Sequence, residues 1–299
     1  MAINPADPIV LMLEGCRKRF GGDLLTLGRQ EIVAKAEQIF RQADRVGYRI
    51  DKSSAESHSD PLSDEAFFHM LGFSSVSSLD ANDYEAATFI HDLNQEEVPK
   101  ELEERFDVVL DRGTSEHVFH LPNLLNTVGR LVRPGGRVIH FVPSSNHIDH
   151  GFYMFSPTLF FDYYTANGFE IPTLWLVVQQ WLRARPTIEI LEYRPGCLEL
   201  VNHGGLDDRA YQVFCVAVRC AATGDRTVPT QGRYTRMWAE RPGEMGRDSV
   251  RGWRRTLAPL ITKLRSTRAG DDLVGKVVNP IKKRFYFKKG PRTLLRYQV

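Results

Sequence analysis

The sequence predicts an α/β fold with a doubly wound, mostly parallel sheet covered by helices on both faces. Two observations carry this prediction. Short apolar runs of strand length alternate with segments of helical periodicity through the first 220 residues, which is the pattern of repeated strand–helix–strand units. Several of these runs end at a glycine or an aspartate, residues that commonly form the turn after a strand. A chain of 299 residues, 42% of them hydrophobic, is long enough to bury such a sheet.

The N-terminal segment predicts a helix, a strand and a second helix. Residues 8–20 have helical periodicity, and two glycines follow them. Residues 24–27 form a short apolar run that stops at Gly28, and the helical spacing returns over residues 31–46. This order of strand, tight turn and helix opens a strand–helix–strand unit. Residues 47–63 are polar and rich in turn formers, so they predict a loop or lid.

Three further strands each end at an aspartate, after a short helix that begins at Ser63 and stops at Gly72. The strands are residues 75–79, 88–91 and 106–110, and the aspartates that follow them are Asp80, Asp92 and Asp111. The second half continues the alternation. It predicts a helix over 121–132, a strand over 137–142, a helix over 156–167, and strands over 170–178 and 211–219.

Charge divides the chain into two predicted parts. Residues 221–299 hold 19 Lys and Arg against 6 Asp and Glu, whereas residues 1–220 hold 20 against 31. We therefore expect an α/β domain over 1–220 and a basic linker and C-terminal extension over 221–299. Such asymmetry indicates an anionic partner, either a membrane surface or nucleic acid. Because no known nucleic-acid-binding module accompanies the basic and aromatic residues near the C-terminus, nucleic acid is the less favoured partner.

The cysteines and the hydropathy pattern predict a cytoplasmic protein. The four cysteines form no C-x-x-C pair, which is typical of reduced thiols in a reducing compartment. The N-terminus lacks the pattern of a secretory signal, and no run of 18 apolar residues occurs. Peripheral attachment to the inner membrane face through the basic extension stays open.

The ends of the predicted strands define a candidate ligand site. In an open α/β sheet, ligands bind beyond the carboxyl ends of the strands, near the reversal of strand order. Asp80 is placed there to accept hydrogen bonds from ribose hydroxyls, or it only caps a turn. Asp92 could meet an adenine amino group, or it forms an Asx turn with Asn94. Gly28 and Gly113 allow close backbone approach to a ligand.

Candidate catalytic residues follow the fourth and fifth predicted core strands. In the segment that ends at Glu116 and His117, the histidine is either a general base or a residue that only holds its loop. His147 and His150 have H-x-x-H spacing, but on a loop without nearby cysteines this predicts no metal. Instead, His150 and Tyr153 are expected to face an acceptor molecule, unless the surrounding aromatic residues simply pack the loop onto the core.

These residues together resemble the class I S-adenosylmethionine-dependent methyltransferases. The stretch 131–139, Leu-Val-Arg-Pro-Gly-Gly-Arg-Val-Ile, is similar to that family's "L-x-P-G-G" turn between helix and strand. The stretch 113–117, Gly-Thr-Ser-Glu-His, is similar to the "LEH" motif after the fourth strand. The stretch 150–157, which ends in Phe-Ser-Pro, resembles the "FSP" start of the next helix in a bacterial subgroup often linked to surface-glycan or secondary-metabolite genes.

The resemblance implies a three-layer α/β/α domain with seven strands, the last pair antiparallel at the edge, and S-adenosylmethionine as cofactor. The implied cofactor-binding residues are Leu27, Gly28, Arg29, Asp80, Asp92, Leu93, Asp111, Gly113 and Thr114. The candidate catalytic residues, chosen from their positions after the strands, are His117 as base, with Glu116, His150 and Tyr153, together with His147, shaping the acceptor site. One feature departs from the family. Thr26 stands where members carry an acid after the first strand, and residues 29–31 replace the later glycines.

The leading hypothesis is therefore methyl transfer to an oxygen or nitrogen of a small-molecule or glycan-like acceptor. An alternative from another class is a binding or scaffold protein that keeps the fold without transfer chemistry and works through its basic extension. The altered first loop favours that alternative. A nicotinamide-dependent oxidoreductase is a third hypothesis, which the missing G-x-G-x-x-G sequence disfavours.

Overall fold

The computed structural model describes residues 1–53, 62–180, 187–198, 206–220, 226–239 and 292–298. The chain divides into two compact units. One comprises residues 1–193, 209–229 and 293–299, and it contains the large sheet. The other comprises residues 194–208 and 230–292, and its described part includes helix α7 (Gly232–Ala239).

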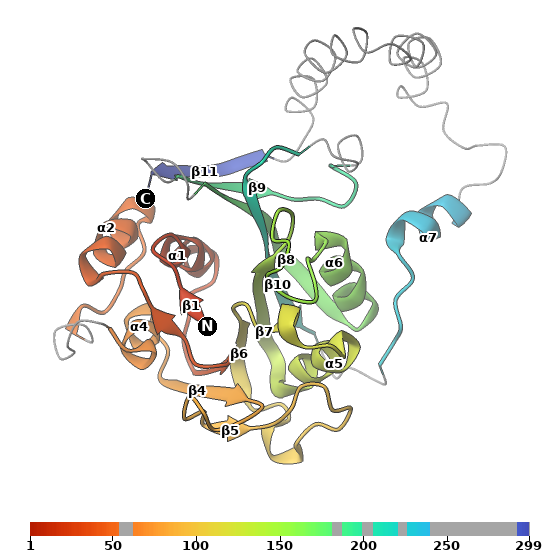
Figure 1. The fold of residues 1–299 in the computed structure, drawn as a ribbon, viewed down its shortest axis with the longest axis horizontal. Helices are drawn as coiled ribbons and strands as arrows, with labels where there is room; N and C mark the ends of the chain where they lie inside the picture. Colours follow the sequence, from red (N-terminus) through yellow and green to blue (C-terminus); the bar gives the residue numbers. More distant parts are fainter. Residues whose placement is uncertain (54–61, 181–186, 199–205, 221–225, 240–291, 299) are drawn as a thin grey trace, which may run out of the picture. The chain divides into compact units, whose positions relative to one another are not determined.

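A sheet of nine strands among the described residues forms the centre of the first unit (Figure 1). The strands lie in the order β11-β9-β8-β10-β7-β6-β2-β4-β5. Their bounds are β2 (Asp23–Leu27), β4 (Ser75–Asp80), β5 (Phe89–Ile90), β6 (Phe106–Asp111), β7 (Val132–Pro143), β8 (Phe169–Gln180), β9 (Thr187–Glu192), β10 (Ala210–Arg219) and β11 (Arg292–Gln298). Strands β2, β4, β5, β6 and β7 are parallel, whereas β10 is antiparallel to both β7 and β8.

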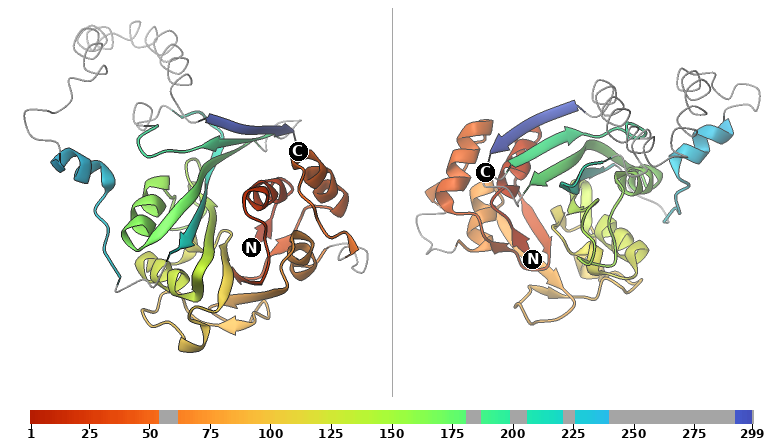
Figure 2. Two further views of the ribbon diagram at one scale, coloured as in Figure 1. Left: turned by 180° about the vertical axis from the view of Figure 1, so that it is seen from behind. Right: turned by 45° about the horizontal axis from the view of Figure 1, so that its top comes forward.

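Helices cover both faces of the sheet. Figures 1 and 2 show α1, α2 and α4 on one side, with α5 and α6 on the other. Their bounds are α1 (Asp7–Arg17), α2 (Ala36–Val46), α4 (Asp64–Leu71), α5 (Leu121–Leu131) and α6 (Pro157–Ala166). Two single-turn 3-10 helices, η1 (Lys100–Leu102) and η2 (Ser115–His117), interrupt the connections around β6. The three-layer α/β arrangement predicted from the alternating pattern is therefore confirmed.

Local sequence signals account for several helix ends. The Ser63 hydroxyl accepts a hydrogen bond from the Ala66 N–H and caps α4, and the Ser156 hydroxyl accepts one from the Thr158 N–H at the start of α6. Gly72 ends α4 with a φ of 108°, a left-handed backbone conformation in which a side chain is strained. These capping residues are the ones from which the sequence predicts the helix boundaries.

The sheet has two more strands than the resemblance implies. The apolar residues of β11, Leu294 and Leu295, pack against the core that β8 and β9 help to form, and β9 is itself antiparallel to β8. The antiparallel pair β8 and β10 is therefore not at the edge of the sheet. Strand β11 also lies in the same compact unit as the sheet, although the sequence predicts it within the basic extension.

The first residues of the helix predicted over residues 31–46 instead form part of a second, two-stranded sheet. Residues Glu31–Ile32 form strand β3, which pairs in parallel with β1 (Ala2–Ile3). Both isoleucines are buried, at 0% and 5% exposure, so burial of this pair holds the N-terminus beside the first loop. The helix α2 accordingly begins at Ala36, five residues later than the periodicity predicts.

Strand order reverses between β2 and β6. From β2 the chain passes outward to β4 and β5, and it then returns to β6 on the other side of β2. The loops after β2, β4 and β6 therefore meet at the carboxyl ends of neighbouring parallel strands. This is the place where open α/β sheets bind their ligands.

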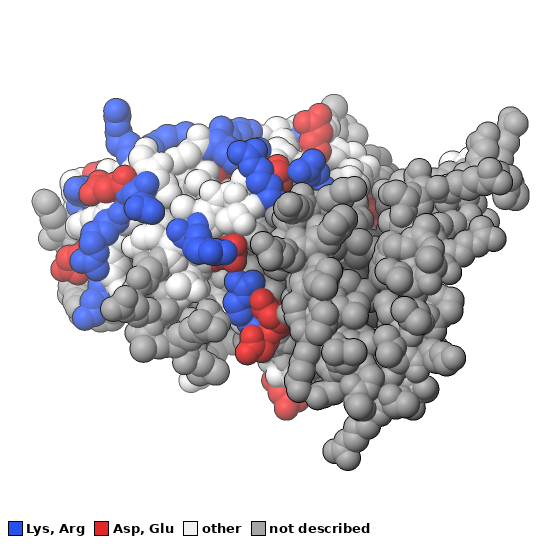
Figure 3. Space-filling model, turned by 90° about the horizontal axis from the view of Figure 1, so that it is seen from above, with Lys and Arg blue, Asp and Glu red and all other residues white. Residues whose placement is uncertain are grey.

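The basic extension predicted over residues 221–299 lies largely outside the described residues. Residues 240–291, with their lysine-rich stretches 282–284 and 288–289, are not described, and neither are residues 54–61 of the predicted loop or lid. Over the described part of one face, Lys and Arg side chains alternate with Asp and Glu side chains (Figure 3). Among the described residues, no helix combines the length and the apolar character that a membrane crossing requires.

Candidate functional site

The loops after β2 and β6 are joined at the strand-order reversal. The Thr114 hydroxyl donates a hydrogen bond to the Leu27 carbonyl at 2.7 Å, and the Gly28 N–H donates to the Leu79 carbonyl at 2.8 Å. Gly28 has a φ of 72°, so a side chain there would be strained. The loops after three parallel strands are thus held together by two short hydrogen bonds.

Several predicted cofactor residues converge around Gly28. A Cβ built on this glycine would lie 3.6 Å from Asp80 Oδ2 and 3.7 Å from Thr114 Oγ1. It would also lie 3.4 Å from Cγ of Met1, whose sulfur is 3.8 Å from the equivalent position on Gly113. The Met1 side chain therefore lies between the two predicted glycines. Leu93, another predicted residue, is 4% exposed.

The altered first loop is stabilised by contacts within the protein. Arg29 forms an ion pair with Asp64 of α4 at 2.8 Å and a longer one with Glu65. The Gln30 side-chain amide donates to the carbonyls of Leu27 and Gly28, while its own oxygen is buried without a hydrogen-bond partner among the described residues. Thr26, at the position of the family's acid, is fully buried. The Arg29 side chain is thus engaged by α4.

The two aspartates after β4 and β5 differ in the hydrogen bonds that their carboxylate oxygens accept. Asp80 Oδ1 accepts from the Ala81 N–H at 2.6 Å, and Oδ2 is the oxygen nearest Gly28. Asp92 Oδ1 accepts from both the backbone and the side-chain nitrogen of Asn94, at 2.9 and 2.8 Å. These bonds lower the pKa of Asp92. The Asx turn that the sequence offered as an alternative for Asp92 is therefore present.

Asp111 faces the interior of the protein. Its side chain is fully buried and accepts hydrogen bonds from the N–H groups of Thr114 and Ser115 and from His140 Nδ1. The second ring nitrogen of His140 then accepts from the Tyr164 hydroxyl at 2.6 Å. Burial by itself would raise the pKa of Asp111, but the hydrogen bond from His140 reverses the effect and lowers it. These hydrogen bonds shape the turn over residues 112–117, and a direct contact of Asp111 with a cofactor stays a prediction.

A buried ion pair ties this turn to the N-terminal helix. Arg112 donates to Asp7 Oδ2 from two guanidinium nitrogens, at 2.6 and 3.2 Å, and it stacks over the Phe141 ring at 4.4 Å. Asp7 is fully buried and Arg112 is 6% exposed. Sequence reasoning misses this pair because its members are 105 positions apart. Arg112 directly follows strand β6, and no local pattern in the sequence indicates its partner.

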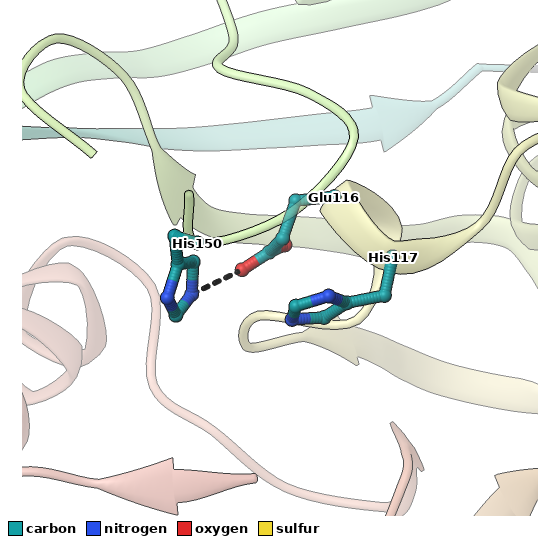
Figure 4. A group of neighbouring side chains, drawn as sticks. All are labelled: Glu116, His117 and His150. Atoms are coloured by element: carbon teal, nitrogen blue, oxygen red, sulfur yellow. Dashed lines mark ion pairs between the residues drawn. The ribbon is translucent and has the colours of Figure 1, made fainter. Parts of the chain in front are cut away.

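Three of the four predicted catalytic residues come together beside this rim. Glu116 and His117 lie on η2, His150 lies on the loop after β7, and their side chains point toward one another (Figure 4). The distance from Glu116 Oε1 to His150 Nε2 is 3.3 Å. Burial, followed by the charge of Asp111, raises the pKa of Glu116 to about 8. Burial and the neighbouring His150 lower the pKa of His117, which favours a neutral imidazole at pH 7.

The loop after β7 rests directly on Glu116. The Glu116 carbonyl accepts from the Phe152 N–H at 2.7 Å, and a Cβ on Gly151 would lie 2.8 Å from the same carbonyl oxygen. Tyr153, the fourth predicted catalytic residue, donates its hydroxyl to the Phe119 carbonyl at 2.7 Å. The Tyr153 ring also stacks with Phe155, as the packing alternative expects. Tyr153 therefore fixes the loop.

Exposed apolar side chains lie on the same two segments as the three residues. They comprise four side chains that are 45–77% exposed: Phe119, Ile148, Phe152 and Met154. The rings of Phe119 and Phe152 meet edge to face at 5.7 Å. Exposed aromatic rings beside polar groups are a common feature of binding surfaces.

Comparisons with known proteins find likenesses to solved structures. The chain resembles the YcgJ protein from Bacillus subtilis, with 10% identity, a TM-score of 0.38 and coverage of 72% of this chain and 99% of that one. It resembles 1,6-didemethyltoxoflavin-N1-methyltransferase from Burkholderia thailandensis, with 13% identity, a TM-score of 0.35 and coverage of 72% and 78%. It also resembles phosphoethanolamine N-methyltransferase 2 from Haemonchus contortus, with 14% identity, a TM-score of 0.38 and coverage of 72% and 53%.

No family model and no curated protein matches the sequence. The two named methyltransferases were solved with S-adenosylhomocysteine. At these identities the likeness is one of fold. The strand order and the flanking helices described above confirm the α/β fold class by themselves.

Proposed function

We propose that this protein is an S-adenosylmethionine-dependent methyltransferase that acts on an oxygen or nitrogen of a small-molecule or glycan-like acceptor. One observation carries the proposal. The candidate cofactor-binding residues at the strand-order reversal lie directly beside a buried carboxylate and two imidazoles. A Cβ on Gly113, one of these residues, would be 3.3 Å from Glu116 Oε1. A nucleoside site and a proton-accepting site would then share one edge of the sheet.

The residues around Gly28 fit a nucleoside cofactor. In this proposal Asp80 Oδ2, 3.6 Å from the Cβ position of Gly28, accepts a hydrogen bond from a ribose hydroxyl, and Gly28 and Gly113 allow close approach of the ligand to the backbone. The Met1 side chain lies in the space between the glycines, so cofactor binding requires its displacement.

When bound, the cofactor supplies an electrophilic methyl group on a sulfonium. The acceptor lone pair forms the new bond to the methyl carbon as the carbon–sulfur bond breaks, and sulfur keeps the electron pair. The acceptor proton must then leave. His117, with its lowered pKa, is the base in this proposal, and the remaining catalysis is positioning.

The apolar surface formed by Phe119, Ile148, Phe152 and Met154 supports an acceptor with a flat apolar face. A sugar ring or an aromatic ring has such a face and also carries a hydroxyl or amine to receive the methyl group. Stacking on exposed rings would place that group near the two imidazoles.

Transfer itself is tested by the release of S-adenosylhomocysteine. Purified protein would be incubated with S-adenosylmethionine and a panel of hydroxylated and amine-bearing sugars and aromatic molecules. We expect product release with at least one acceptor class, and a rate about 100-fold lower for His117→Asn because general-base assistance contributes about that much. If binding of the cofactor is measurable but His117→Asn turns over as fast as the wild type, His117 is not the base.

The altered first loop favours the scaffold alternative. Thr26 is buried where the family carries an acid, and the Gln30 side chain hydrogen bonds to the backbone of its own loop. The scaffold alternative requires that the protein bind neither S-adenosylmethionine nor S-adenosylhomocysteine. Its working surface would then be the basic residues of the extension, with an anionic membrane as the partner and peripheral attachment as the result.

A further inference from the structure

The cluster of Glu116, His117 and His150 has the composition of a metal site. One ligand atom from each side chain, a carboxylate oxygen or a ring nitrogen, lies within 4.8 Å of the other two (Figure 4). The separation between Glu116 Oε1 and His150 Nε2, which joins the turn to the loop after β7, is 3.3 Å. Two of the residues sit on one rigid turn, and the third comes from a loop that is hydrogen bonded to that turn.

A second observation concerns the hydrogen bonding of the Glu116 carboxylate. Glu116 is 1% exposed, yet neither of its oxygens accepts a hydrogen bond from any described residue. Buried polar atoms are nearly always hydrogen bonded, and those that are not commonly mark an ion, a water or a functional role. His147, on the same loop as His150, also has a buried ring nitrogen without a hydrogen-bond partner among the described residues.

We propose that Glu116, His117 and His150 bind a divalent transition-metal ion, with positions left for water or an acceptor oxygen. Two imidazoles and one carboxylate favour Zn²⁺, Co²⁺ or Mn²⁺ over Mg²⁺ and Ca²⁺, which prefer oxygen donors. This ligand set differs from the His147–His150 spacing on the loop, from which the sequence predicts no metal.

The position of the site gives the ion a chemical role. Because Gly113 adjoins both Glu116 and Met1, the cluster borders the space where the methyl group would be transferred. A metal bound there would take over the role that the metal-free protein gives to His117, because a coordinated imidazole nitrogen cannot accept a proton. It would coordinate a hydroxyl acceptor, lower the pKa of that hydroxyl and orient it. This role rests on the proposed methyl transfer, whereas the binding of the ion does not.

The test is metal binding to the full-length, tag-free protein after chelator treatment. Calorimetry with Zn²⁺ and visible absorption with Co²⁺ should each show one metal ion bound per protein chain. We expect an affinity at least 100-fold lower for Glu116→Gln and for His150→Asn, and an unchanged affinity for His120→Asn, an exposed histidine three positions after His117. Circular dichroism of each variant confirms that it is folded.

A further variant keeps all three ligands and moves one of them. Gly151→Ala should push the loop away from the Glu116 carbonyl, because the added methyl would be 2.8 Å from that oxygen, and it should weaken Co²⁺ binding. The proposal is overturned if the wild type binds no metal at millimolar concentration, or if Glu116→Gln and His150→Asn bind it as the wild type does. Titration of the same samples with S-adenosylhomocysteine separates this failure from a failure of the proposed function.

Discussion

Replacement of Asp7 by alanine is expected to lower the free energy of unfolding by about 3–5 kcal/mol. The change leaves the Arg112 guanidinium, which is 6% exposed, without the carboxylate that now accepts two of its hydrogen bonds. A buried charge that loses its partner costs far more than an exposed one. The same carboxylate also accepts from the Asn4 N–H and from Gln179, so helix α1 would lose a tie to β8 as well.

Urea denaturation of the wild type and the variant at pH 7 measures this effect. Asp44→Ala, on the exposed side of α2, is the matched control and should change the free energy by no more than about 0.5 kcal/mol. The double change of Asp7→Leu with Arg112→Met should recover much of the loss, since it removes both charges. A loss below 1 kcal/mol for Asp7→Ala would show that Arg112 reaches solvent.

Replacement of Glu116 by glutamine is expected to make the metal-free protein relatively more stable as the pH rises. The pKa of Glu116 is about 8 in the folded protein against 4.5 for an ordinary glutamate. A carboxyl whose folded pKa is raised keeps its proton in the native state and loses it on unfolding, so wild-type stability falls between pH 4.5 and 8. Glutamine cannot titrate. The stability difference between variant and wild type should therefore grow by about 3 kcal/mol from pH 5 to pH 8.

Denaturation curves at several pH values, with chelator present, measure that difference. Glu101→Gln, at an exposed position, serves as the control and should show a difference that does not change with pH. Groups that do not interact with Glu116 titrate equally in variant and wild type, so they cancel in the comparison. A difference that stays constant from pH 5 to pH 8 would mean that the Glu116 carboxylate ionises normally in the folded protein.

Much of the central fold can be predicted from the sequence because its signals are local. Alternating apolar runs and helical segments identify the strands and helices, and Ser63, Gly72 and Ser156 mark the helix ends. The carboxyl-end rule then selects the edge of the sheet at which the candidate site residues meet. Strands β1 and β3 escape prediction because two residues have no periodicity. Strand β11 escapes it because its pairing joins residues about 100 positions from β9.

The roles of individual site residues are harder to predict. Asp80 and Asp111 both follow strands, but Asp111 turns inward because His140 and Tyr164, which are distant in sequence, supply its hydrogen-bond partners. The grouping of Glu116 with His150 depends on how closely the loop at Gly151 packs against η2. Local sequence patterns do not contain such contacts between distant segments.

The central claim is that the rim around Gly28 and Asp80 binds S-adenosylmethionine, and calorimetric titration with this nucleoside and with S-adenosylhomocysteine tests it most directly. We predict binding in the micromolar range, about −8 kcal/mol. Asp80→Ala should weaken it at least tenfold, while Asp83→Ala, at an exposed position three residues on, should leave it unchanged. Absence of binding to both nucleosides by a folded wild-type protein would contradict the claim and favour the scaffold alternative.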